Sequence, residues 1–334
     1  MKEDNFINII KNTLPESSSY IGDDTAYIAE KDMILTQDTL IEDVHFRKAT
    51  ISPYNLGIKS IAVNLSDIAA SGGIPAYILI SLSLPENIQE NFLEEFYKGV
   101  REICSKYNVI VVGGDLTRAS KITISVAVVG FGSGVNPSKR SYAKVDDLVI
   151  VTGNFGSSRA GLWILEESLS SSETIRKIPK PVSEKFIKAH INPTPRLKEG
   201  RVIASSCGTT TAIMDTSDGL ADALYKISLQ SNVSMEINYK DIPYDDDLSI
   251  ITKIANIDFC KWILYGGEDY ELVATVSVEC FKKILLEQIP VRIIGKVIPS
   301  INNSVFLKMA DKIIEINSNS LDNELFSHFA AKRE

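Results

Sequence analysis

Residues 212–220 read Ala212-Ile213-Met214-Asp215-Thr216-Ser217-Asp218-Gly219-Leu220, an apolar run that breaks off into an acidic turn and then enters a helical pattern. The turn alone could simply end a strand and cap the helix that begins near Leu220. The apolar residues before the turn, however, indicate a buried strand that ends at two carboxylates, and the ends of such strands are where α/β folds build their sites. The segment therefore favours an α/β fold with a site at this strand end.

Five further clusters place carboxylates where an apolar run breaks off. They are Gly22-Asp23-Asp24, Thr36-Gln37-Asp38, Ser66-Asp67, Gly113-Gly114-Asp115 and Gly266-Gly267-Glu268-Asp269. Taken singly, each cluster is more often a turn or a helix cap than a ligand set. Hard oxygen ligands displayed by several separate segments are what a site for several Mg²⁺ ions requires. Their number therefore favours a shared magnesium site over six unrelated turns.

Composition sets the broad class of the protein. The chain has 334 residues, of which 44% are hydrophobic and 23% charged, and this length suggests two domains. The formal net charge of -8 argues against a nucleic-acid-binding surface. The 4 cysteines form no CxxC pair, so we expect reduced thiols and a cytoplasmic protein.

The segment from Ile68 to Pro85 carries no charge and is long enough to suggest a membrane span. Ser71-Gly72-Gly73-Ile74-Pro75 interrupts it, and residues 78–84 alternate as a strand does. The pattern predicts a helix end, a turn and a buried strand, and we expect no membrane association. The N-terminus leads into an amphipathic helix and not into a signal-peptide hydrophobic region.

The periodicity predicts alternating helices and strands in two units, residues 1–137 and 146–334. The helix over 53–71 is the best delimited, because Pro53 stands near its start and Gly72-Gly73 follows its end. Ser60, Asn64 and Asp67 share one polar stripe of this helix. We expect further helices over 88–107, 156–166, 195–206 and 220–230. The expected strands cover 33–36, 78–84, 109–112, 122–129, 146–152, 269–276 and 291–297.

Several common catalytic motifs are absent from the sequence. It contains no GxxxxGK[ST], no HExxH, no GxSxG and no GxGxxG that opens a helix. Among the 3 histidines, His45 follows the cluster that ends at Asp38, and a contact with phosphate is a credible role for it. We expect His190 and His328 to be structural. In the loop Gly266-Gly267-Glu268-Asp269, Glu268 is the preferred ligand-binding residue, because adjacent glycines permit close approach of a ligand.

In this order, the motifs resemble those of thiamine-monophosphate kinases, in the superfamily of aminoimidazole ribonucleotide synthetase. The resemblance extends from about Ile21 to the C-terminus. Besides the six clusters, it rests on Glu42-Asp43-Val44-His45-Phe46, Asn64-Leu65-Ser66-Asp67-Ile68, Ser158-Arg159-Ala160-Gly161-Leu162 and Pro193-Thr194-Pro195-Arg196. It implies a two-domain α/β (α+β) fold in which N-terminal sheets close into a barrel across a homodimer and a C-terminal α/β domain covers the cleft.

The resemblance also implies the reaction, in which ATP phosphorylates thiamine monophosphate to thiamine diphosphate. The implied Mg²⁺ ligands are Asp24, Thr36, Gln37, Asp38, Asp67, Asp115, Asp215 and Asp218. The implied ATP contacts are Tyr97, Gly114, Asp115, Arg140 and Ser217. The implied contacts to thiamine monophosphate are His45, Glu268 and Phe326.

This chemistry fits the residues independently, and it needs no general base. The acceptor is already an ionised phosphate, so the obstacle is repulsion between two polyanions, where unit charges 4 Å apart interact by about 4 kcal/mol at an effective dielectric near 20. Magnesium ions held by aspartates would cancel this repulsion and align an in-line transfer.

The sequence departs from the family pattern at two places. Gln37 stands where the family has threonine, and Ser141-Tyr142-Ala143-Lys144 replaces a glycine, alanine and arginine run after Arg140. Two alternatives stay open at this point. One is another ATP-dependent enzyme of the superfamily, of the ligase type, and the other is a non-enzymatic module that binds divalent cations.

Overall fold

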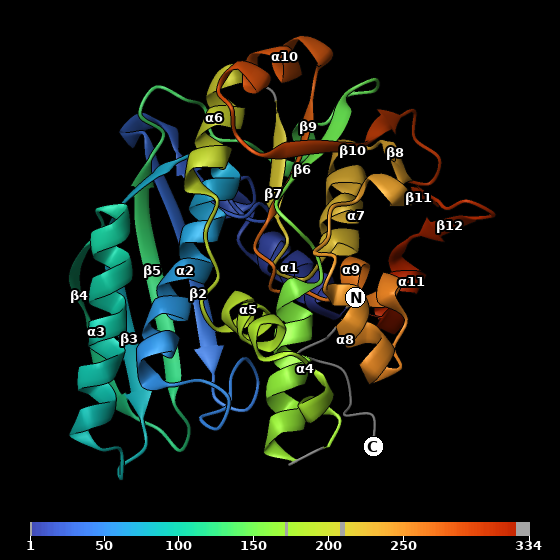
Figure 1. The fold of residues 1–334 in the computed structure, drawn as a ribbon. Helices are drawn as coiled ribbons and strands as arrows, with labels where there is room; N and C mark the ends of the chain where they lie inside the picture. The colour runs from blue at the N-terminus through green and yellow to red at the C-terminus, as the bar shows by residue number, and fades with distance from the viewer. Residues whose placement is uncertain (1, 171–172, 208–210, 325–334) are drawn as a thin grey trace.

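The computed structural model describes residues 2–170, 173–207 and 211–324, and it contains two separate β-sheets (Figure 1). The first sheet has five strands in the order β1-β2-β5-β3-β4. These strands are β1 (Ala26–Ile28), β2 (Met33–Ile41), β3 (Ile74–Leu84), β4 (Ile110–Arg118) and β5 (Thr123–Phe131). All neighbours are antiparallel except β3 and β4.

Two long helices, α2 (Pro53–Ser71) and α3 (Glu90–Tyr107), lie side by side on one face of this sheet (Figure 1). The helix α2 ends where the sequence predicts. The Ser52 hydroxyl accepts a hydrogen bond from the Asn55 amide at its start, and Gly72 adopts a left-handed conformation at its end. A Cβ on Gly57 would lie 2.1 Å from the Phe96 carbonyl oxygen, so glycine is what allows α2 and α3 to pack this closely. The helix α1 (Lys2–Thr13) precedes β1.

The second sheet has seven strands in the order β12-β11-β8-β10-β6-β9-β7, and only β8 and β11 pair in parallel. Its strands are β6 (Leu148–Thr152), β7 (Ala212–Asp215), β8 (Ser234–Asn238), β9 (Leu272–Val276), β10 (Val291–Ile298), β11 (Val305–Lys308) and β12 (Ile313–Ile316). The helices in this half of the chain are α4 (Ser157–Leu169), α5 (Lys180–Ile191), α6 (Leu197–Cys207), α7 (Leu220–Ser231), α8 (Leu248–Ala255), α9 (Phe259–Tyr265), α10 (Val278–Leu286) and α11 (Ser318–Glu324). Short 3₁₀ helices cover Pro15–Ser17, Ala29–Lys31, Arg140–Tyr142, Ile175–Lys177 and Tyr239–Asp241.

The helix α2 is also where the two halves of the chain meet, because α6 packs along it (Figure 1). Ala69 of α2 belongs to an apolar cluster that includes Ile203 of α6 and Ile213 of β7. Gly200 makes this contact possible, since a Cβ there would lie 2.0 Å from the Ala69 carbonyl oxygen. One helix therefore carries side chains toward both sheets.

Strand β4 is an exposed edge, and the sheet face opposite α2 and α3 is exposed as well. All nine residues of β4 are exposed, among them Ile110, Val112 and Leu116. On the neighbouring strand β3, Tyr77 and Leu79 are exposed too. An uncovered apolar edge of this kind is a surface on which another chain can pair.

Three expectations need correction. Strand β2 continues to Ile41 and β4 to Arg118, so Thr36–Asp38 and Gly113–Asp115 lie within strands and not at their ends. The apolar run of β2 breaks off earlier because the strand faces a polar stripe of α2. On β4 the end of the apolar run marks no change of burial, because Ile110 and Val112 are exposed like the residues that follow them. Cys207 and Cys280 form a disulfide between α6 and α10, so the expectation of reduced thiols is wrong for this pair.

The uncharged segment 68–85 divides between α2, a turn and β3, as the sequence predicts. Within the described ranges, we find no helix with the length and apolar character that a membrane crossing requires.

Candidate active site

Three carboxylates from distant parts of the sequence converge beside α2, where the two halves of the chain meet. Asp24 precedes β1, Asp67 lies on the last turns of α2, and Asp215 ends β7. Each offers one oxygen, and these oxygens lie within 4.8 Å of one another. Asp215 is fully buried, and its Oδ1 has no hydrogen-bond partner among the residues described. A buried oxygen without a partner, beside two further carboxylates, fits a hard cation such as Mg²⁺.

Neighbouring polar groups orient these carboxylates. The Thr36 hydroxyl donates to Asp67 Oδ2 at 2.5 Å, and the Ser66 hydroxyl donates to Asp215 Oδ2 at 2.6 Å. On the same stripe of α2, Asn64 Oδ1 accepts a hydrogen bond of 2.8 Å from the backbone amide of Asp38. The polar stripe predicted for α2 therefore holds β2 beside the cluster through Asn64 and Asp67. Strand β7 is held by Ser66, which lies outside that stripe.

The electrostatics of this cluster are unfavourable without a cation. Burial, followed by repulsion from Asp218 and Asp24, raises the pKa of Asp38 to about 6. Burial and the charge of Asp24 raise the pKa of Asp215 to about 7. Burial, with Asp38 and Asp215 nearby, also raises the pKa of Asp67 well above its ordinary value. Bound cations would relieve this repulsion and keep the carboxylates ionised.

Arg140 forms an ion pair with one carboxylate of the cluster. Its Nη2 donates to Asp24 Oδ1 at 2.8 Å, and its backbone amide donates to Asp23 Oδ1 at 3.0 Å. Burial would lower the pKa of Arg140, but the carboxylate of Asp24 raises it, so the guanidinium stays charged. The Ser231 hydroxyl of α7 donates to the Arg140 carbonyl at 2.7 Å and ties this loop to the second sheet. The arginine is therefore fixed beside the carboxylates.

The turn after β7 links the cluster to the loop at 266–269. The Ser217 carbonyl accepts a hydrogen bond of 2.7 Å from the Glu268 amide. Asp218 lies 3.2 Å from Lys226 Nζ, and the same ammonium lies 2.8 Å from the buried Asp222. The hydrogen bond between Glu268 and Ser217 therefore joins the loop at 266–269 to the turn after β7.

The two acidic residues of the loop at 266–269 have different contacts. Asp269 accepts backbone hydrogen bonds from Gly156 and Ser158 at 2.7 and 2.9 Å, so it caps the start of α4. Glu268 instead has a half-buried side chain, 28% exposed, with Oε1 lying 2.9 Å from Lys59 Nζ. The structure thus separates a helix-capping aspartate from a carboxylate that is accessible to a ligand.

Two histidines lie near Glu268. His45 follows β2, and its Nδ1 accepts the Ile41 amide at 3.0 Å. His190 Nδ1 lies 3.4 Å from Glu268 Oε2 and 3.0 Å from the Ser158 hydroxyl. Burial, followed by the charge of Lys59, lowers the pKa of His190 to about 3, so its ring is neutral near pH 7.

The structure places two residues beside Glu268 that the sequence does not single out for this site, Lys59 and His190. The available signal was Lys59 itself, the single charged residue between Pro53 and Ser66. His190 carried no comparable signal, because only the tertiary packing brings α5 to this loop.

Four of the expected site residues lie apart from the cluster. The Gln37 amide donates to the Ser125 hydroxyl at 3.2 Å on the exposed sheet face, whereas Thr36 points to α2. Gly114 and Asp115 lie on β4, whose register places them three strands from Asp38, on the order of 14 Å away. Tyr97 lies on α3, with its ring edge-to-face to Phe96. Phe326 is outside the described residues.

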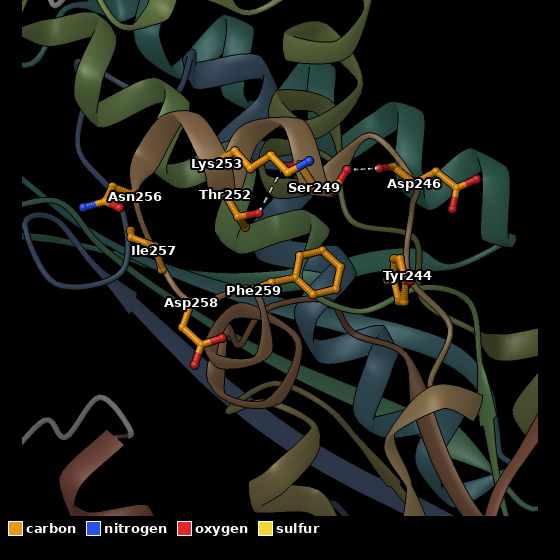
Figure 2. A pocket seen from close by; sticks show the side chains of 9 residues that line it. All are labelled: Tyr244, Asp246, Ser249, Thr252, Lys253, Asn256, Ile257, Asp258 and Phe259. Atoms are coloured by element: carbon orange, nitrogen blue, oxygen red, sulfur yellow. Dashed lines mark hydrogen bonds between the residues drawn. The ribbon is translucent and has the colours of Figure 1, made fainter. Parts of the chain in front are cut away.

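A separate hollow of about 800 Å³ opens beside α8. Figure 2 shows its nine lining residues, with the rings of Tyr244 and Phe259 next to one another. Their ring centroids are 4.8 Å apart with an interplanar angle of 86°. No carboxylate of the aspartate cluster lines this hollow, so it is not where the cluster would meet a substrate.

Comparison with known proteins agrees with this arrangement. Residues 22–132 match the N-terminal domain of AIR synthase related proteins, and residues 144–308 match their C-terminal domain. The fold and the site therefore define a two-domain α/β protein of the AIR synthase type.

Among its relatives, a thiamine-monophosphate kinase from Bacillus subtilis (strain 168) is 36% identical over 92% of this chain and 93% of its own length. A second one, from Aquifex aeolicus (strain VF5), is 37% identical over 84% of this chain and 87% of its own length. The solved structure of AaThiL complexed with AMPPCP and TMP superimposes with a TM-score of 0.80 at 34% identity, covering 94% of this chain and 98% of that one. The chain belongs to the thiamine-monophosphate kinase family.

Proposed function

We propose that this protein transfers the γ-phosphoryl group of ATP to thiamine monophosphate, giving thiamine diphosphate and ADP. Family membership supports the reaction. The observation that carries it is the convergence of Asp24, Asp67 and Asp215 around a buried carboxylate oxygen that has no hydrogen-bond partner in the described part of the chain. A site of this kind suits the transfer of a charged group between two phosphates.

The carboxylates of the cluster hold the metal ions in this proposal. Asp24, Asp67 and Asp215 form its centre, and the other ligands are Thr36, Gln37, Asp38, Asp115 and Asp218. When bound, Mg²⁺ neutralises the charge between donor and acceptor phosphates and favours in-line transfer. No side chain is required as a general base, because the acceptor oxygen belongs to a phosphate that is mostly ionised at neutral pH.

Arg140 and Ser217 contact ATP in this proposal, beside the metal ligands Asp24 and Asp218. Glu268 and His45 bind thiamine monophosphate, with the carboxylate of Glu268 near its cationic ring. Phe326 stacks on the same ring, since an aromatic face attracts a cation. The acceptor site thus lies on the side of the cluster where Lys59 and His190 surround Glu268.

We further propose a homodimer in which two N-terminal sheets close into a barrel. The exposed apolar edge of β4 supports this assembly. The position of Gly114 and Asp115, three strands from Asp38, supports it too, because a second copy could bring its own β4 to the cluster. In such a dimer, Tyr97 would complete the ATP site and Gln37 would complete the metal site.

The two units of the proposal are residues 1–137, which supply most metal ligands, and residues 146–334, which cover the site. The separation of the two sheets, one within 26–131 and the other within 148–316, supports this division.

We propose the cytoplasm as the location, where ATP and Mg²⁺ are supplied.

An assay of ADP release with ATP and Mg²⁺, with and without thiamine monophosphate, tests the reaction. The proposal expects ADP release that depends on thiamine monophosphate and yields thiamine diphosphate in equal amount. Release without the acceptor would point to another ATP-dependent enzyme of the superfamily. Binding of Mg²⁺ without any release would point to a cation-binding module.

A further inference from the structure

Lys59 is a buried charge in the middle of α2. Only 1% of its side chain is exposed, yet its ammonium lies in the interface between α2 and the loop at 266–269. In the described part of the chain, no hydrogen bond of regular geometry reaches this ammonium. The ion pair of 2.9 Å with Glu268 is therefore its main compensation. A buried ammonium is costly, so its presence here calls for a functional explanation.

We propose that Lys59 is a positioning residue of the acceptor site, which keeps the Glu268 carboxylate ionised and correctly oriented to receive the cationic ring of the acceptor. This inference rests on the proposed function, because it concerns how the same site selects its substrate.

The difference in exposure between the two partners assigns their roles. The Lys59 side chain is 1% exposed and lies behind Glu268, whose side chain is 28% exposed. A ligand in the site can therefore touch the carboxylate and not the ammonium. Lys59 consequently acts through Glu268 and is not itself a contact to the phosphate.

The backbone fixes where Glu268 stands, and Lys59 fixes where its carboxylate points. Glu268 has a φ of 57°, a left-handed conformation that is unusual for a side chain of this type. The hydrogen bond from its amide to the Ser217 carbonyl holds it in this conformation. Its Oε1 is then held by Lys59 and its Oε2 lies toward His190. A strained residue held from several sides is typical of a functional position.

The charges around Glu268 identify Lys59 as the group that sets its state. Burial would raise the pKa of Glu268, but the charge of Lys59 and then that of His190 outweigh it and lower the pKa. His190 is neutral near pH 7, so Lys59 supplies the lasting positive charge. The other charged or titratable groups that act on this network are His45, Arg159 and Tyr270.

The experiment compares four proteins: wild type, Lys59→Met, Glu268→Gln and the double variant. Titration with thiamine monophosphate, in the presence of Mg²⁺ and a non-hydrolysable ATP analogue, gives the Kd. We expect Lys59→Met to raise this Kd about tenfold or more, as is usual when a supporting residue of a site is lost. The KM for ATP should change by no more than about twofold.

The double-mutant comparison separates positioning from a general structural effect. Once Glu268 is neutral, Lys59→Met should add less than about twofold to the Kd. The double variant removes both charges and should fold even where Lys59→Met does not. Lys308→Met is the matched control, because it removes a lysine from a surface pair with Glu236 and should leave both constants unchanged.

The pH dependence gives a readout that a purely structural role would not change. Relative to wild type, Lys59→Met should bind thiamine monophosphate progressively more weakly as the pH falls, because Glu268 then becomes protonated at a higher pH. Equal losses for ATP and thiamine monophosphate would overturn the inference, and so would equal effects of Lys59→Met with and without Glu268→Gln. Wild-type protein that fails to bind thiamine monophosphate would instead overturn the proposed function.

Discussion

The Ser66 hydroxyl donates a hydrogen bond of 2.6 Å to Asp215 Oδ2, and this bond joins helix α2 beside the first sheet to strand β7 of the second. Asp67, the next residue of α2, belongs to the same carboxylate cluster as Asp215. The candidate metal site therefore exists only where the two halves of the chain are docked. Stability of this interface and activity should consequently be linked.

Replacing Ser66 with alanine tests that link directly. The substitution removes the donor to Asp215, and a hydrogen bond to a charged group is worth about 1.5–3 kcal/mol. We expect a loss of this order in the free energy of unfolding, together with a lower affinity for Mg²⁺. Ser205→Ala, which alters an exposed serine of α6, is the control. Unchanged Mg²⁺ affinity in Ser66→Ala would contradict the assigned role of this hydrogen bond.

Asp38→Asn and Asp215→Asn should each abolish turnover and leave the fold intact. An asparagine keeps the shape of the side chain but removes the charge that a shared magnesium site needs. Because the cluster is repulsive without metal, we expect Asp215→Asn to unfold at the same or a higher temperature than wild type in EDTA. Asp311→Asn, at an exposed position, serves as the control. Near wild-type rates in either cluster variant would rule out the shared site.

Stability without metal should fall as the pH rises. The pKa values of Asp38, about 6, and Asp215, about 7, both lie above their ordinary value of 3.8. Folding therefore favours the protonated forms. Their contribution is fully present below a pH of about 4 and is lost as the pH rises through about 7. Since one pKa unit corresponds to about 1.4 kcal/mol, the loss is on the order of a few kcal/mol.

Urea unfolding in EDTA at several pH values, for wild type and Asp215→Asn, measures this loss as the difference between the two proteins. Saturating Mg²⁺ should remove the trend, because the bound ion stabilises the ionised carboxylates. A wild-type protein that gains stability relative to Asp215→Asn as the pH rises in EDTA would show that the carboxylates are not in mutual repulsion.

His45→Ala should raise the KM for thiamine monophosphate more than the KM for ATP. His45 lies beyond β2 on the side of Glu268, and its ring acts electrostatically on that carboxylate. Steady-state kinetics with each substrate varied in turn measures both constants. Equal increases in the two KM values would contradict a role confined to the acceptor.

Local sequence signals predicted the parts of the fold that depend on local chemistry. The helix α2 was delimited on both sides because Pro53 starts it and Gly72 ends it. The turn from Asp215 to Asp218 follows β7 and precedes α7, as the apolar run before it and the helical pattern after it predicted. The resemblance to a family supplied the overall architecture and the members of the cluster, which no single motif could establish.

Features that depend on tertiary packing could not be predicted from the sequence. The strand β2 continues through Thr36–Asp38 because the polar stripe of α2 accepts its backbone and side chains. The pairs Ser66–Asp215 and Lys59–Glu268 join residues 149 and 209 positions apart, and no local pattern reveals such contacts. The position of Asp115 on an exposed edge strand, away from Asp38, likewise follows from the order of strands in the sheet.

The reaction proposed for this site is the direct transfer of the γ-phosphoryl group of ATP to thiamine monophosphate. The most direct measurement follows ATP labelled at its γ-phosphate through one turnover with Mg²⁺ and thiamine monophosphate. We predict that the label appears in the terminal phosphate of thiamine diphosphate, and that neither Asp215→Asn nor EDTA-treated wild type transfers it. Label found only in inorganic phosphate, with thiamine monophosphate unchanged, would contradict the account.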